Sequence, residues 1–285
     1  MNLFLAPALL LASSTGIAWE EVAETPRGYV PQGMVAVGGE LFLSAYRGDD
    51  ECSAVFALRR CGDGFTFEKA FAMPPEARHT GGLASVPGRP DLLFATDYHS
   101  NKVYLLDLAS SRRTGRARVL ASSPSGLNKA SACCVVRLCG GRHVLLVTEF
   151  RLLRRGRNAF FDWSADGTAA SITPAKDVPT YRNLGYSQGV KWREGFVYES
   201  GNRPLRASYL SRYPLGPAMR DGRARRTQAE TRPGPGRYIE DFEFFGGYIW
   251  CTDEGTDKLY RTPNPFDKSR STGDHNNPIR PHPGM

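Results

Sequence analysis

After its first 18 residues the sequence has no long hydrophobic run, and it lacks the short motifs that identify many enzymes. A membrane-spanning helix needs about 20 apolar residues, so we expect no integral membrane segment. There is no G-x-x-x-x-G-K-[ST] phosphate loop and no H-E-x-x-H zinc motif. No C-x-x-C or paired Cys/His spacing indicates zinc, and no nucleic-acid-binding motif occurs. Function therefore has to be inferred from the fold and its repeats.

Turn-forming residues are abundant in what remains. The chain has 285 residues, of which 41% are hydrophobic and 23% charged, so it can bury a sizeable core. Gly 30 and Pro 20 together exceed average usage, which favours many turns over long helices. The composition indicates a globular protein that is not a helical bundle.

The first 18 residues have the composition of a secretory signal peptide. The stretch 3–12 is almost wholly apolar, and no charged side chain occurs before residue 20. Gly16 and Ala18 fit the small-residue positions of a cleavage site. We expect residues 1–18 to be a signal peptide and the protein to be secreted. The alternative is that this stretch is a buried first strand.

The six cysteines permit disulfides in a secreted chain: Cys52, Cys61, Cys133, Cys134, Cys139 and Cys251. We expect one or two disulfide bonds, with buried free thiols as the alternative, and the sequence does not choose the pairing. The two vicinal cysteines should point to opposite faces of an extended strand.

Lysine and arginine number 37 against 29 aspartates and glutamates, which gives a net charge of +8. Three clusters, expected in loops, hold much of this excess: Arg112, Arg113, Arg116 and Arg118; Arg151, Arg154, Arg155 and Arg157; Arg220, Arg223, Arg225 and Arg226. Solvated turns are the simplest interpretation. Because clustered charge concentrates opposite charge, the second interpretation is an anionic cell-surface glycan as partner.

One pattern recurs five times along the chain: a short apolar strand, a Gly-bearing turn, and a second apolar strand that ends in a polar residue. The matching first strands begin at Gly33, Gly82, Cys133, Gly189 and Asp241, at intervals of 49 to 56 residues. A third strand follows each pair, and a fourth follows in the first four units. Proline-containing links separate the units. Repeats of this length and strand content are typical of propeller blades.

We therefore predict an all-β fold, a five-bladed β-propeller that forms one domain over residues 19–263 and acts as a monomer. The fifth unit lacks a fourth strand, and Trp19–Glu24 supplies one from the other end of the chain. Pairing there closes the ring and removes two open strand edges. We expect residues 264–285 to form a flexible tail. A β-sandwich is the alternative, but it does not explain five equal units.

The repeat predicts which polar residues surround one mouth of the central channel. The polar residues around the starts of the first strands are Gln32, His79, Thr80, Ser131, Gln188 and Glu240. The residues near the ends of the second strands are Ala45, Asp97, Glu149, Glu199 and Asp253. Carboxylates gathered at one mouth must be protonated, hydrogen-bonded or bridged by a cation such as calcium. The simpler alternative is that each acidic residue caps its own turn.

The stretch Gly185–Leu215 has the order aromatic-Ser-Gln-Gly-apolar, then Tyr-Glu-Ser, then Gly, Arg and a Ser-bearing strand. This order resembles the signature region of the secreted glutaminyl-peptide cyclotransferases of plant and bacterial type, which are five-bladed propellers. The segment IEDFEFFGGYIW resembles a Glu-rich strand of the same family. The segments ATDYHSNKVYLLDL and CTDEGTDKLYR are similar to blades of the superfamily that holds NHL-repeat proteins and SMP-30/gluconolactonase hydrolases.

These resemblances imply two enzymatic roles for the channel. A cyclotransferase would use Glu199 as the catalytic proton shuttle, with Gln188 orienting the substrate amide and with Gln32, His79 and Glu240 binding substrate. A lactonase-like hydrolase would instead hold a divalent cation through Glu149, Asn202 and Asp253, and Glu199 would then be a metal ligand in place of a proton shuttle. No cofactor is certain from the sequence. The ligand is expected to be a small molecule or peptide. The alternative class is a non-catalytic extracellular binding propeller.

Overall fold

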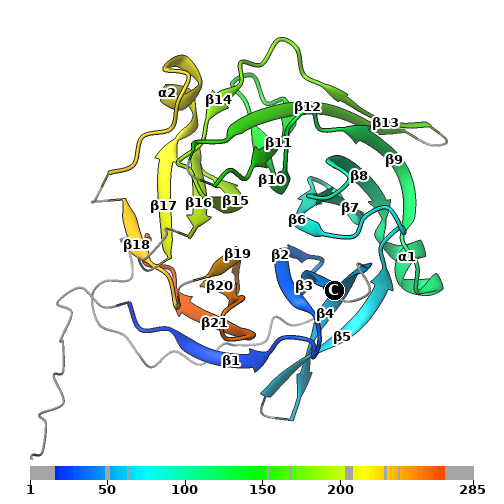
Figure 1. Ribbon diagram of the computed structural model, residues 1–285. Coiled ribbons are helices and arrows are strands. Elements are labelled where there is room, and N and C mark those ends of the chain that lie inside the picture. The colour runs from blue at the N-terminus through cyan, green and yellow to red at the C-terminus, as the bar shows by residue number, and fades with distance from the viewer. Residues whose placement is uncertain are drawn as a thin grey trace, which may run out of the picture.

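Five small antiparallel sheets form a ring around a central axis (Figure 1). The structure is a computed structural model that describes residues 17–48, 52–62, 64–152, 154–166, 169–202, 208–227, 230–236 and 238–266. Each innermost strand contacts the innermost strands of both neighbouring sheets, so the ring is continuous. The predicted five-bladed β-propeller is therefore confirmed.

Every blade has the same order of strands from the axis outward. The innermost strands are β2 (Val30–Val37), β6 (Thr80–Val86), β10 (Ala130–Arg137), β15 (Ser187–Arg193) and β19 (Ile239–Phe245). The second strands are β3 (Glu40–Arg47), β7 (Arg89–Asp97), β11 (His143–Glu149), β16 (Phe196–Gly201) and β20 (Tyr248–Asp253). The third strands are β4 (Cys52–Cys61), β8 (Lys102–Asp107), β12 (Arg157–Asp166), β17 (Tyr209–Pro214) and β21 (Lys258–Pro263). The outermost strands are β5 (Gly64–Ala72), β9 (Arg118–Pro124), β13 (Ala169–Pro174), β18 (Thr231–Pro233) and β1 (Glu20–Glu24).

The hydrophobic core lies between blades. Because side chains alternate across a strand, a strand between two neighbouring blades buries both of its faces. In β7, Leu93 and Ala95 pack toward the first blade, whereas Leu92 and Phe94 pack toward the third. This two-sided burial explains why the second strands of the repeat are continuously apolar. The vicinal Cys133 and Cys134 likewise face different clusters, as predicted.

Glycines let the innermost strands approach closely at the axis. A Cβ atom on Gly82 would lie 2.5 Å from the Cα of Ala132, and one on Gly33 would lie 2.5 Å from the carbonyl oxygen of Gly81. No side chain larger than hydrogen fits at such distances without backbone movement. The glycine that opens the repeat in the first, second and fourth units is thus a packing requirement.

The amino-terminal strand closes the ring. β1 pairs antiparallel with β21 on the outside of the fifth blade, with Glu20 opposite Arg261 and Glu24 opposite Lys258. Ala23 packs into the apolar cluster between the fifth and first blades. The predicted closure is confirmed, and Figure 1 shows β1 as the outer strand beside β21.

Several details differ from the sequence prediction. Arg112 and Arg113 lie in a short helix, α1 (Leu108–Thr114), instead of a loop, and Asp107 caps it by accepting a hydrogen bond from the Ser110 N–H. A second helix, α2 (Leu215–Arg220), follows β17. The extra two-residue strand β14 (Tyr181–Arg182) pairs with β12.

Other predictions fare differently. All six cysteines are free, so the one or two expected disulfides are absent. Residues 1–16 of the predicted signal peptide and residues 267–285 of the predicted tail lie outside the described residues. Among the described residues, no helix is long and apolar enough to span a membrane.

Candidate functional site

The central axis carries two separate cavities. One, the first mouth, has a volume of about 90 Å³ and lies where the innermost strands begin. The other, the second mouth, has a volume of about 280 Å³ and lies where they end. The two cavities share no lining residue, because the middle of the axis is filled.

Lys191 fills the middle of the axis. Its Nζ donates hydrogen bonds to the Met34 carbonyl (2.8 Å), the Leu83 carbonyl (3.5 Å) and the Asp241 carboxylate (2.7 Å). With its own strand β15, the side chain therefore joins four of the five blades. Asp241 also accepts the Met34 N–H at 2.8 Å, so the charge pair sits within a network of backbone bonds.

The first mouth collects residues from every blade. From the beginnings of the innermost strands come Gln32, His79, Gly81, Ser131, Gln188 and Glu240, and from the ends of second strands come Tyr46, Tyr98, Phe150 and Glu254. The four substrate-binding residues predicted from the sequence, Gln32, His79, Gln188 and Glu240, therefore line a single cavity. Whether they bind substrate stays a prediction.

An aromatic stack forms one side of the first mouth. The His79 ring stacks on Tyr46 with centroids 3.9 Å apart and on Tyr98 with centroids 4.8 Å apart. The His79 Nε2 lies 3.0 Å from the Gln32 Oε1, which it can reach as a donor. Burial, with smaller contributions from His99 and Lys129, lowers the pKa of His79 to about 4. This histidine is therefore neutral at pH 7 and offers a polar ring without charge.

Two glutamates face the other side of the first mouth. Glu240 is only 4% exposed, and its Oε1 accepts a hydrogen bond from the Gln188 Nε2 at 3.1 Å. Burial, followed by the charge and the hydrogen bond of Glu254, raises the pKa of Glu240 well above its usual value. Two carboxyl groups in contact disfavour each other's ionisation, so Glu240 holds a proton more readily than an exposed glutamate does.

The acidic residues at the ends of the second strands do not line this cavity. Each accepts a backbone N–H from the link that enters its own blade: Asp97 from His79, Glu149 from Asn128, Glu199 from Leu184 and Asp253 from Tyr238. Asp97 also accepts the Ser100 N–H, which fits the predicted turn cap. This shared pattern shows that the acidic column fastens each link to its second strand.

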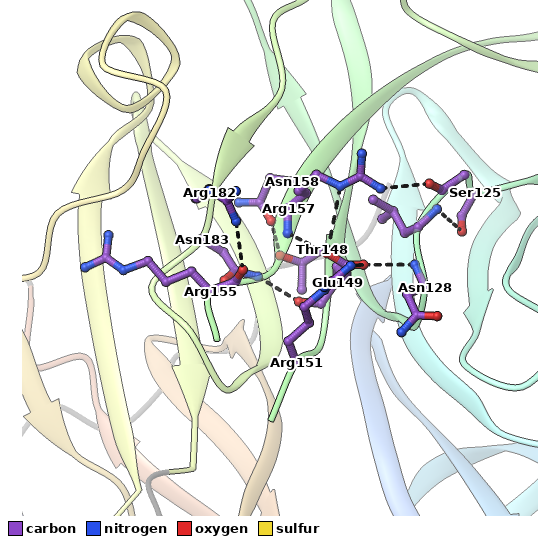
Figure 2. A network of polar contacts seen from close by, with 12 residues as sticks. Ser125, Asn128, Thr148, Glu149, Arg151, Arg155, Arg157, Asn158, Arg182 and Asn183 are labelled. Carbon is purple, nitrogen blue, oxygen red and sulfur yellow. Dashed lines mark hydrogen bonds and ion pairs between the residues drawn. The ribbon is translucent and has the colours of Figure 1, made fainter. Parts of the chain in front are cut away.

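Glu149 illustrates the pattern (Figure 2). Its carboxylate accepts hydrogen bonds from the Asn128 N–H, the Arg157 N–H and the Arg151 guanidinium, each at 2.9 Å. Burial alone would raise the pKa of Glu149, but the Arg151 bond and the two backbone bonds lower it below its usual value. The side chain is fully buried and stays ionised.

Glu199, the predicted catalytic residue, is also fully buried. Its carboxylate accepts hydrogen bonds from the Leu184 N–H (3.0 Å), the Ser187 hydroxyl (2.8 Å), the Asn158 amide (3.3 Å) and the Tyr213 hydroxyl. Burial outweighs these bonds and raises its pKa. No atom of Glu199 lines either mouth, so the geometry does not favour the catalytic role, which stays an untested prediction.

The sequence prediction missed, by one position, the first-mouth residues that come from the second strands. Tyr46, Tyr98, Phe150 and Glu254 each follow a member of the column formed by Ala45, Asp97, Glu149 and Asp253. Because successive side chains of a strand point to opposite faces, the column residue turns into its blade and the next residue turns toward the cavity. An aromatic or acidic residue directly after each strand was the available signal.

The predicted cation ligands Glu149, Asn202 and Asp253 lie in three different blades. The carboxylates of Glu149 and Asp253 are engaged by backbone N–H groups, as described above. Among the described residues, no three His, Cys, Asp or Glu side chains are grouped closely enough to hold a metal ion. The arrangement does not fit a calcium site built from this set.

The second mouth is larger and more apolar. Its polar lining comes from Ser85, His143, Lys191, Arg193 and Glu243. Glu243 accepts the Phe244 N–H at 2.7 Å and the Ala36 N–H at 3.3 Å. Burial raises the pKa of Glu243 to about 7, although the nearby Lys191 charge opposes the shift. This glutamate therefore keeps its proton to a higher pH than an exposed glutamate does.

Comparisons with known proteins support the fold. No family model matches the sequence, and no curated protein sequence matches it. The structure is similar to that of an engineered GH43 glycoside hydrolase, with a TM-score of 0.51, 13% identity, and coverage of 83% of this chain and 50% of that chain. It is also similar to the calcium-binding protein regucalcin from Agrobacterium tumefaciens, with a TM-score of 0.49, 14% identity, and coverage of 86% and 93%. Likenesses at this identity concern the fold alone.

Proposed function

We propose that the first mouth is the active site of a glutaminyl cyclotransferase-like enzyme, with Glu240 as the proton shuttle. The observation that carries the proposal is the Glu240 carboxyl, which lines the cavity, accepts a hydrogen bond from Gln188 and has a pKa raised well above its usual value by burial and Glu254. Perturbed carboxyl groups of this kind are suited to general acid–base catalysis. The sequence resemblance supplies the substrate class, a peptide with an amino-terminal glutamine.

The reaction needs no group beyond those of the substrate and a proton carrier. The neutral α-amine of the substrate attacks the carbon of its own side-chain amide, a C–N bond forms, and the amide nitrogen leaves as ammonia. The proton lost by the amine must reach the leaving nitrogen. Glu240 can donate its proton to the leaving nitrogen and take up the proton that the amine loses, so the carboxyl is restored at the end of the reaction.

The neighbouring side chains are suited to orienting the substrate amide. The Gln188 Nε2 donates to Glu240, which leaves the Gln188 carbonyl oxygen to accept from the substrate amide. The neutral His79 and its aromatic neighbours form a wall against which a flat amide can pack. The cavity of about 90 Å³ admits a side chain and not a whole peptide, which fits recognition of a terminal residue.

The decisive experiment compares two glutamine substitutions. We expect the purified protein to release ammonia from short peptides with an amino-terminal glutamine, and we expect Glu240→Gln to lower kcat/KM by about 100-fold or more. Glu76→Gln is the matched control, since this exposed glutamate forms only a long ion pair of 4.0 Å with Lys102. Both variants should keep the wild-type melting temperature.

Three outcomes would contradict the proposal. Turnover by Glu240→Gln at the wild-type rate would show that Glu240 is not the proton shuttle. Peptide binding without ammonia release would favour the alternative, a non-catalytic binding propeller. Calcium binding by calorimetry that is lost in Asp253→Asn, with calcium-dependent hydrolysis of sugar lactones, would favour the metal-dependent hydrolase.

A further inference from the structure

Two of the three arginine clusters in the sequence come together in the fold. The Arg155 Nη1 donates to the Ala224 carbonyl at 2.9 Å, although the residues are 69 positions apart. The Arg182 N–H donates to the Gly222 carbonyl at 3.0 Å, and the Ala224 N–H donates to the Arg182 carbonyl at 2.7 Å. Strand β14 therefore joins the loop after β11 to the loop after α2 (Figure 1).

This junction holds nearly all of the excess charge of the protein. We define the arginine patch as nine residues: Arg151, Arg154, Arg155, Arg157, Arg182, Arg220, Arg223, Arg225 and Arg226. Within the same segments only Glu149 and Asp221 are acidic, so the patch has a net charge of +7 out of +8 for the chain. The rest of the molecule is almost neutral, so the positive electrostatic field of the protein originates mainly from the arginine patch.

Most of the patch has no carboxylate to pair with. Arg151 and Arg157 share the buried Glu149, and Arg220 and Arg225 share Asp221. The other five, Arg154, Arg155, Arg182, Arg223 and Arg226, form no ion pair with a described residue. Figure 2 labels two of these five, Arg155 and Arg182, where the Arg182 Nη1 donates to the Arg155 carbonyl at 3.5 Å.

The third sequence cluster provides a contrast. Arg112 of that cluster donates to the Glu40 carboxylate at 2.6 Å, and its guanidinium also lies over the Phe42 ring. Its charge is thus used within the fold, as expected of a structural arginine. In the arginine patch, Arg226 lies over the Tyr209 ring at 3.6 Å, but like Arg154 and Arg223 it has no carboxylate partner among the described residues. Exposed charge without such a partner indicates a surface that can bind an anion.

We propose that the arginine patch binds an acidic polysaccharide. The patch contains no lysine, and guanidinium groups pair bidentately with sulfate or carboxylate oxygens. It extends from Arg151, next to the first-mouth residue Phe150, to the loop after α2, so it can follow a linear chain of charges. The predicted secretion of the protein would bring it to such polymers.

Other polyanions fit the surface less well. Only three large apolar side chains are exposed among the described residues, and of these only Leu152 lies next to residues of the arginine patch in the sequence. One leucine gives a membrane surface little to bury. No exposed aromatic ring lies in the patch, so it lacks the stacking platforms that hold single-stranded nucleic acid. A charged polymer without exposed bases or lipid tails is the better match.

The test uses the full-length protein with a fluorescent heparin fragment as the polysaccharide probe. We expect Arg154→Glu combined with Arg223→Glu to raise Kd at least about tenfold, because both side chains are exposed and unpaired. The control is Arg116→Glu combined with Arg118→Glu, which removes the same charge from exposed positions outside the patch. The control should change Kd less than about twofold, and added salt should weaken wild-type binding.

The other outcomes overturn the proposal. Equal weakening by both pairs would mean that net charge alone attracts heparin. Failure of the wild-type protein to bind heparin at low salt would exclude an acidic polysaccharide as the ligand. Tighter binding to phosphatidylglycerol vesicles or to single-stranded DNA than to heparin would reassign the patch to a membrane or to nucleic acid. Circular dichroism of each variant identifies loss of folding.

Discussion

At the scale of single residues, Glu199 and Glu240 both have a raised pKa, but their surroundings differ. Every oxygen of Glu199 accepts hydrogen bonds from donors of the fold, whereas Glu240 faces a cavity. We expect Glu199→Gln to lower the free energy of unfolding by about 2 kcal/mol, because its amide NH₂ would face donors in place of an acceptor. Urea denaturation measures this loss. A stable but inactive Glu199→Gln variant would restore the catalytic role predicted from the sequence.

Glu243 makes stability depend on pH. The ordinary pKa of this carboxyl is 4.5, and burial raises it to about 7 in the folded protein. Between these values the folded state holds a proton that the unfolded state releases, so the free energy of unfolding falls as pH rises through this range and then levels off. The loss is of order 1–3 kcal/mol. Denaturation curves from pH 4 to 8 should be flatter for Glu243→Gln than for wild type, and parallel curves would contradict the assignment.

The sequence predicted where the candidate site lies, but it did not predict all of the residues that line it. The starts of the repeats located Gln32, His79, Gln188 and Glu240, because equivalent residues of equal repeats meet at one end of a ring. The repeat could not show that Glu254, one position after Asp253, would contact Glu240. That contact depends on how two strands of one blade twist, which no spacing within the chain records.

At the scale of elements, β1 is the part on which closure depends. It pairs only with β21, and deleting it would expose both the edge of β21 and the apolar cluster around Ala23. We expect deletion of residues 19–24 to lower the free energy of unfolding by more than about 2 kcal/mol or to cause aggregation. Deletion of residues 268–285 is the control. Equal stability of the two truncations would show that β1 does not close the ring.

The blades themselves were predictable because the same succession of strands and turns recurs five times at nearly equal intervals. Short helices were not. The helix α1 begins where Asp107 caps the Ser110 N–H, a local signal that was hidden within an arginine-rich stretch. Among the described residues the outer strand β18 spans Thr231–Pro233. Outer strands have few neighbours, so their sequence pattern is weak and their bounds are hard to predict.

At the scale of the whole molecule, the blades are held together by apolar packing between them and not by disulfide bonds. Burial raises the pKa of Cys133 to about 12 and raises the pKa of Cys134 and Cys251 well above the usual value, so these thiols are unreactive while the protein is folded. The exposed thiols are Cys52, Cys61 and Cys139. We expect a thiol reagent to label three cysteines in the native protein and six in denaturant without reductant. A count below six in denaturant would reveal a disulfide.

The Lys191 side chain that fills the axis has a kinetic consequence. Because the first mouth does not connect with the second, the substrate and product of the proposed reaction would have to exchange through one opening. Product that has not yet departed therefore occupies the place that the next substrate requires. An enzyme built in this way should show product inhibition that is competitive with substrate, and opening the far end of the axis would not relieve it unless Lys191 itself were removed.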